Sequence, residues 1–89
     1  MRLLLVEDDR LLADGLARQL EKAGFSVDTT AIAREAVVLG EQEDYRAVVL
    51  DLGLPDGSGL DVLRKWRANQ IILPVLILTA RGDWQDKVN

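Results

Sequence analysis

The 89-residue sequence contains no cysteine and no histidine. The first absence excludes disulfides, a thiol nucleophile and zinc sites with cysteine ligands, and the second excludes imidazole catalysis and metal sites with histidine ligands. Aromatic residues make up only 4%, so a hydrophobic core must consist mainly of aliphatic side chains. Basic residues are also in the minority, 11 against 15 acidic ones, and the net charge of −4 argues against a nucleic-acid-binding face on this segment.

Long hydrophobic runs are absent as well. Apolar runs such as 3–6 and 75–78 have the length of one strand, whereas a membrane-spanning helix needs about 20 apolar residues. An acidic cluster at 7–9 directly follows the first run, which is not the pattern of a signal peptide. With 48% hydrophobic and 29% charged residues, the sequence predicts one globular domain with no membrane partner, and we expect a cytoplasmic location.

Apolar runs and amphipathic segments alternate along the chain. Strands are predicted at 3–6, 25–29, 47–50 and 74–78, and helices from Asp9 to just before Gly24, at 32–41, at 60–68 and from 84 onwards. Glycines and a proline predict a loop at 53–59. This alternation predicts an α/β fold with a parallel sheet covered by helices on both faces. We expect a flavodoxin-like three-layer sandwich with strand order 2-1-3-4.

In such sheets, sites form at the carboxyl ends of the strands where the strand order reverses. Glu7 and Asp8 follow the first predicted strand, Asp51 follows the third and Thr79 the fourth. Carboxylates brought together repel one another unless a cation lies among them, and oxygen ligands favour Mg²⁺, Mn²⁺ or Ca²⁺ over zinc. A carboxylate beside such a cation can attack phosphorus and form an acyl phosphate, and a Thr79 hydroxyl can donate to a phosphoryl oxygen.

These motifs, in this order and at these spacings, resemble the receiver domain of two-component response regulators, which has a CheY-like fold. The resemblance extends over the whole chain and is carried by LLLVEDD at 3–9, DLGLPDGSG at 51–59 and ILTA at 77–80. The first two segments are similar to those of the subgroup in which a C-terminal winged-helix DNA-binding domain follows the receiver. The resemblance therefore implies a transcription regulator that contacts DNA only through a domain outside this sequence.

The resemblance also implies roles for individual residues. Asp51 is expected to accept a phosphoryl group from a cognate histidine kinase. The Mg²⁺ ligands are expected to be Glu7, Asp8, Asp51 and the backbone carbonyl of Gly53. Thr79 is expected to be the switch hydroxyl that moves toward the phosphoryl group. Asp9 is expected to cap the first helix rather than to bind metal.

One family element has no counterpart. Receivers have a fifth strand that ends in a lysine, but Lys87 follows Thr79 by only eight residues (87 − 79), too few for a helix and another strand. We therefore expect residues 1–89 to form a receiver domain that lacks its fifth strand and last helix. The fourth strand is then an apolar sheet edge, and we expect the chain to self-associate through it.

Two function classes remain open, with a third less favoured. The first is a phosphorylation-controlled signalling switch, not an enzyme with its own substrate, in which the charge of the phosphoryl group repacks a neighbouring face. The second is a Mg²⁺-dependent phosphohydrolase with an aspartate nucleophile, although such enzymes typically have an acid–base aspartate where this chain has Gly53. The third is a mononucleotide-binding flavodoxin-like domain, whose phosphate the acidic residues at 7–9 would repel.

Overall fold

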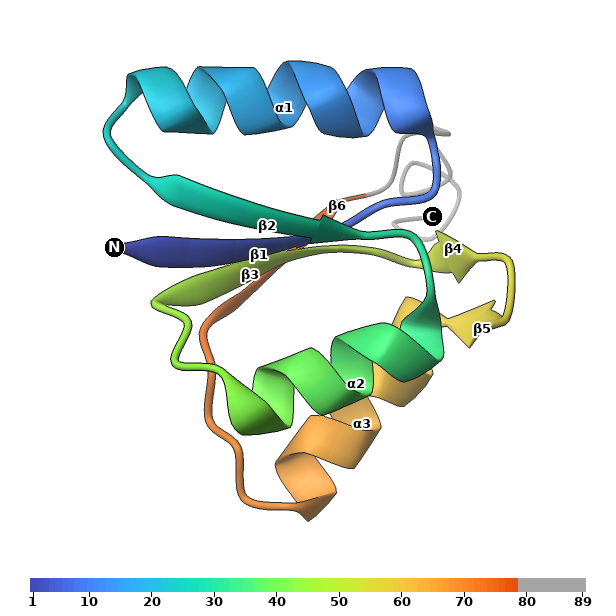
Figure 1. Ribbon diagram of the computed structural model, residues 1–89. Helices are drawn as coiled ribbons and strands as arrows, with labels where there is room; N and C mark the ends of the chain where they lie inside the picture. Colours follow the sequence, from blue (N-terminus) through green and yellow to red (C-terminus); the bar gives the residue numbers. More distant parts are fainter. Residues whose placement is uncertain (79–89) are drawn as a thin grey trace, which may run out of the picture.

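The computed structural model describes residues 1–78. In chain order the elements are β1 (Arg2–Val6), α1 (Arg10–Lys22), β2 (Ser26–Thr30), α2 (Ala33–Gln42), β3 (Ala47–Asp51), β4 (Gly53–Leu54), β5 (Gly57–Ser58), α3 (Gly59–Ala68) and β6 (Val75–Leu78). Four of the strands form a parallel sheet in the order β2-β1-β3-β6, with α1 on one face and α2 and α3 on the other (Figure 1). The predicted three-layer fold and strand order are therefore confirmed, and the helix expected from residue 84 lies outside the described residues.

The apolar runs form the central strands because both of their faces are covered. Leu4 and Val6 of β1 belong to a buried cluster with Leu50 of β3 and Trp66 of α3. Successive side chains of a strand point to opposite faces, so the equally buried Leu5 lies on the α1 side of the sheet. The core thus has two aliphatic layers, with one indole ring between α2 and α3.

The ends of α1 are set by local side-chain and backbone preferences, as predicted. The Asp9 carboxylate accepts a hydrogen bond from the backbone N–H of Leu12 (3.1 Å) and caps the first turn. At the other end, Gly24 adopts a φ of +101°, a conformation that side chains with a Cβ rarely adopt. These two signals place the start of α1 directly after the acidic residues that follow β1.

The segment 53–59 differs from the predicted loop because it contains a short antiparallel hairpin. Gly53 pairs with Ser58 and Leu54 with Gly57. Two-residue strands built around glycine carry no alternating apolar pattern, so no periodic signal indicates them. Leu54 is buried in the core, and the hairpin is therefore anchored to the sheet.

A polar cluster joins three segments at the amino end of the sheet. Arg2 forms ion pairs with Asp28 of β2 (2.5 Å) and with Glu43 after α2 (2.7 Å), and its guanidinium lies 5.1 Å from the ring centre of Tyr45. The buried Tyr45 hydroxyl donates to Asp28 (2.8 Å). Burial and this hydrogen bond raise the pKa of Tyr45 to about 12. The cluster fixes β1, β2 and the segment between α2 and β3 relative to one another.

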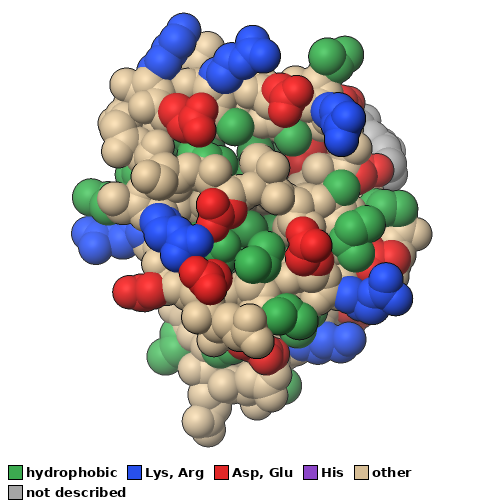
Figure 2. All heavy atoms as spheres, viewed as in Figure 1, with side chains coloured by type: hydrophobic (Ala, Val, Ile, Leu, Met, Phe, Trp, Pro, Cys, Tyr) green, Lys and Arg blue, Asp and Glu red, His purple; other side chains and the backbone are tan. Residues whose placement is uncertain are grey.

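The surface carries charges of both signs. On the face seen in Figure 2, acidic and basic side chains are interspersed rather than gathered by sign. In the described part of the chain, no helix is both long and apolar enough to cross a membrane.

Within residues 1–78, β6 pairs with β3 on one side only, and its Leu76 and Ile77 side chains are exposed. This exposed apolar edge agrees with the expectation for the fourth strand.

Candidate functional site

The strand register brings the predicted acidic residues together. Val6 at the end of β1 is aligned with Leu50 of β3, so the next residues, Glu7 and Asp51, lie side by side. The β1–β2 ladder continues one residue beyond β1, since the Glu7 N–H donates to the Thr30 carbonyl (3.0 Å). Backbone pairing on both sides of β1 therefore holds Glu7 at the carboxyl edge of the sheet.

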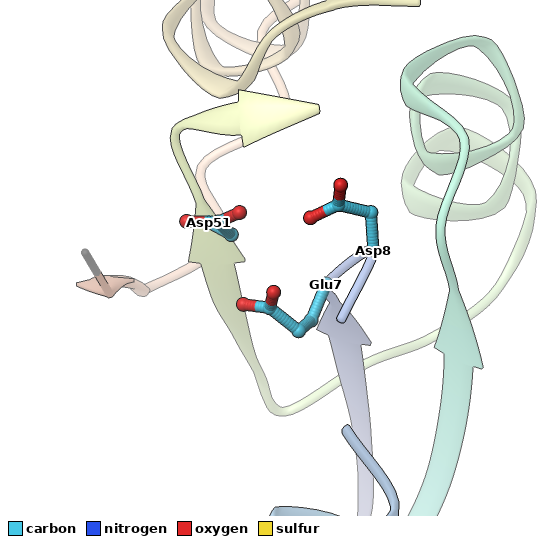
Figure 3. Close-up of side chains that lie close together, drawn as sticks. All are labelled: Glu7, Asp8 and Asp51. Carbon is cyan, nitrogen blue, oxygen red and sulfur yellow. The ribbon is translucent and has the colours of Figure 1, made fainter. Parts of the chain in front are cut away.

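Glu7, Asp8 and Asp51 form one compact group of carboxylates. One ligand oxygen from each residue lies within 4.8 Å of the other two, and the three side chains face a common space between the ends of β1 and β3 (Figure 3). Glu7 and Asp51 are buried, at 4% and 7% exposure, whereas Asp8 is exposed. The group therefore combines two carboxylates in the protein interior with one that faces solvent.

The Glu7 carboxylate is electrostatically unfavourable in this position. Its Oε1 accepts from the Asp9 N–H (3.0 Å), but among the described residues no group hydrogen-bonds to the buried Oε2. Burial raises the pKa of the Glu7 carboxyl, and the negative charges of Asp51 and Asp8 act in the same direction. A cation beside Oε2 would reverse both effects, so these residues fit a hard divalent metal with oxygen ligands.

The site is open to ligands on the α1–α2 side. A hollow of about 270 Å³ lies beside Glu7 and Asp8, between the end of β2 and the first turns of α1 and α2. Its lining is mostly polar and includes Thr30 and the charged side chains of Arg10 and Glu35. Glu7 and Asp8 can therefore be reached from solvent through this hollow, although Glu7 is buried.

The backbone of Asp51 is closely packed against the start of α3. The Gly59 N–H donates to the Leu52 carbonyl (3.0 Å). A Cβ on Gly59 would lie 2.2 Å from the Asp51 carbonyl oxygen, which no side chain can do. Only glycine permits this approach, so Gly59 closes the base of the hairpin directly behind the candidate acceptor.

The structure separates the predicted site residues into three groups. Glu7, Asp8 and Asp51 are brought together, and Gly53 lies two residues beyond Asp51 in β4. Thr79 lies outside the described residues. Asp9 caps α1, as predicted. The roles of these residues as acceptor and ligands stay predictions at this point.

Sequence reasoning missed two further residues that shape the site. One is Gly59, whose close packing against Asp51 is a tertiary contact. The other is Asp56 at the tip of the hairpin, whose carboxylate binds backbone N–H groups of α2. The residue types predict Asp56 only as part of a turn, because its partners lie more than 20 positions earlier in the chain.

Residues 3–89 match the family model described as response regulator receiver domain. Over 88 residues the chain is 50% identical to "Virulence transcriptional regulatory protein PhoP" of Salmonella choleraesuis (strain SC-B67) and 47% identical to "Transcriptional regulatory protein PhoP" of Escherichia coli (strain K12). These alignments cover 99% of this chain but only 39% and 40% of the two relatives, so the chain spans about two fifths of their length.

Solved structures give the same result for the fold. The response regulator protein TrrA from Thermotoga maritima, solved in complex with Mg²⁺-BeF, matches with a TM-score of 0.87 and 28% sequence identity. This match covers 98% of the present chain and 76% of that one.

Proposed function

The chain belongs to the response regulator receiver domain family, and on that basis we propose that residues 1–89 act as a receiver whose Asp51 accepts a phosphoryl group from a histidine kinase. The observation that carries the proposal is the convergence of Glu7 and Asp8 on Asp51 at the switch point of the sheet. A likeness in sequence does not by itself bring these three side chains together. Phosphoryl transfer to Asp51 requires it, because the metal and the acceptor oxygen must be held close to one another.

Mg²⁺ is the metal that this site is proposed to hold. The residues that would hold it are Glu7, Asp8, Asp51 and the backbone carbonyl of Gly53. The support is the oxygen-only donor set, the buried Glu7 Oε2 without a hydrogen-bond donor among the described residues, and a structural relative whose title names Mg²⁺. When bound, the ion offsets negative charge on the transferred phosphoryl oxygens.

The chemical step assigned to Asp51 is an in-line displacement at phosphorus. A carboxylate oxygen of Asp51 attacks the phosphorus of a phosphohistidine, an O–P bond forms, and the N–P bond of the donor breaks with its electron pair passing to the imidazole nitrogen. The strand register holds Asp51 at the carboxyl edge of β3, and the close contact with Gly59 fixes its backbone. The chain thus supplies a nucleophile that is already oriented.

The proposed consequence is a switch rather than turnover of a substrate. An acyl phosphate on Asp51 adds close to two negative charges, toward which Thr79 is proposed to move. The relatives are named as transcriptional regulators and are more than twice as long as this chain, so DNA binding is assigned to a segment beyond the receiver. We also propose a cytoplasmic location for the receiver. The phosphohydrolase alternative is not favoured by these comparisons.

Self-association is proposed to use the exposed edge of β6. The edge offers unpaired backbone groups within the described chain, flanked by the exposed apolar side chains of Leu76 and Ile77. A second copy can pair its own β6 with this edge and cover both side chains.

Phosphorylation of Asp51 can be tested with a small-molecule donor. We expect the protein incubated with MgCl₂ and acetyl phosphate to gain one phosphoryl group by intact-mass spectrometry, and to gain none when EDTA replaces MgCl₂. Asp51→Ala should remove the adduct, whereas Asp44→Ala, at an exposed aspartate before β3, should retain it. Repeated release of phosphate from esters without an adduct would instead favour the phosphohydrolase, and no adduct at all would refute the proposal.

A further inference from the structure

The tip of the β4–β5 hairpin is bound to the start of α2. The Oδ1 atom of Asp56 accepts from the N–H of Ala33 (2.6 Å), and Oδ2 accepts from the N–H of Arg34 (3.1 Å). The residue at the N-cap position of α2 is Ile32, whose side chain makes no capping hydrogen bond. Asp56 therefore caps the N-terminus of α2. In most helices a Ser, Thr, Asn or Asp at the N-cap position itself has this role.

This contact is strong for a surface contact. A carboxylate at a helix N-terminus meets free N–H groups and the positive end of the helix dipole. The two backbone hydrogen bonds lower the pKa of Asp56, so the carboxylate is ionised at neutral pH and both bonds are charge-assisted. Arg34 adds a longer ion pair at 3.9 Å. Two elements that are distant in sequence are thereby held at a fixed spacing.

Three contacts, at three levels from base to tip, hold the hairpin between Asp51 and α3 against the rest of the protein. At its base the Gly59 N–H binds the Leu52 carbonyl, in its middle Leu54 is buried in the core, and at its tip Asp56 binds α2. The proposed metal ligand Gly53 lies between the first two levels, in β4. Glycine has the greatest backbone freedom of any residue, so the direction of its carbonyl depends on how firmly the hairpin around it is held.

We propose that Asp56 is a positioning residue for the metal site, because by binding the hairpin tip to α2 it fixes the direction of the Gly53 carbonyl. The inference rests on the Mg²⁺ part of the proposed function, in which that carbonyl is a ligand. Asp56 does not touch the ion, and it acts through Leu54 and Pro55, the two hairpin residues that separate it from Gly53. Residues that orient ligands in this way influence metal affinity although they contribute no donor atom.

Magnesium binding can be measured without phosphorylation. MgCl₂ is titrated into ¹⁵N-labelled protein, and the amide shifts of Asp8 and Leu52 report the dissociation constant. We expect Asp56→Ala to weaken binding about 10-fold, the lower end of the effect of removing an outer-shell partner. Asp56→Asn retains an acceptor for the Ala33 N–H and should lose less. Asp61→Ala, which removes an exposed carboxylate of α3, should bind Mg²⁺ as the unsubstituted protein does.

A second variant separates positioning from loss of helix stability. Ile32→Ser in the Asp56→Ala background gives α2 a local cap, which should raise the melting temperature without binding the hairpin again. Mg²⁺ affinity that stays low in this double variant supports positioning, whereas affinity that returns with stability overturns it. Equal affinity of Asp56→Ala and the unsubstituted protein also overturns it, and leaves the phosphorylation result of the proposed function untouched. No Mg²⁺-dependent shift in the unsubstituted protein overturns both.

Discussion

Gly40 of α2 lies directly against the indole ring of Trp66 in α3. A Cβ at position 40 would lie 2.4 Å from Cε2 and Nε1 of the ring and 2.6 Å from Cζ2. Trp66 has 0% exposure, so its ring cannot move aside into solvent. Its Nε1–H also donates to the Val37 carbonyl (3.2 Å), and a displaced ring would weaken this bond. Adding one methyl group at Gly40 should therefore separate α2 from α3.

Gly40→Ala is expected to destabilise the fold by about 2 kcal/mol. Overpacking a closed core costs about 1–3 kcal/mol, and the weakened indole hydrogen bond costs about 1 kcal/mol. The higher helix propensity of alanine offsets about 1 kcal/mol of this. For a chain of this size, the net loss corresponds to a fall of about 10 °C in the midpoint of thermal unfolding.

Gly15→Ala in α1 is the matched control. The substitution is the same and also lies inside a helix, but a Cβ at Gly15 has no neighbour within 4 Å. It should therefore stabilise the protein by about 0.5–1 kcal/mol through helix propensity alone. Urea unfolding followed by circular dichroism measures both variants, and the penalty at Gly40 should shrink in a Trp66→Leu background. The reasoning is refuted if Gly40→Ala proves as stable as Gly15→Ala.

The remaining predictions concern Tyr45 and the edge of β6. Tyr45 is the one tyrosine of the sequence, and in the folded protein its phenol absorbance should titrate near pH 12 instead of 10. Because folding raises this pKa, the contribution of the hydroxyl to stability is complete below pH 10 and is lost between pH 10 and 12, a loss that Tyr45→Phe should lack. For the β6 edge, sedimentation should show association that rises with concentration and that Leu76→Lys suppresses. A strictly monomeric protein at high concentration contradicts self-association, and a tyrosine midpoint near 10 contradicts the burial argument.

The sheet and its acidic site could be predicted because their signals are local and periodic. Continuous apolar runs mark β1, β3 and β6, and each is short enough to be a buried strand. Once the strand order is known, the residues after the first and third strands must meet at one edge. Glu7 and Asp51 were placed together by this topology rather than by any contact visible in the sequence.

What could not be predicted depends on contacts between distant segments. Leu60 fits the spacing of an apolar stripe in α3 but is 40% exposed, while Val62 is buried at 1% because it faces α2 and the sheet. Ile32 at the start of α2 gives no capping signal, since the cap comes from Asp56. In each case tertiary packing decides which side chain has a structural role, and residue types alone do not indicate it.

The cap of α2 comes from a residue 23 positions further along the chain than the first amide it binds. A helix with its cap residue next to it can complete its first turn as soon as that short segment is ordered. In α2, the amides of Ala33 and Arg34 gain their acceptors only after β3 and the hairpin have formed. We therefore expect the first turn of α2 and the hairpin to open and close together, so that hydrogen exchange at these two amides reports the opening of a distant loop.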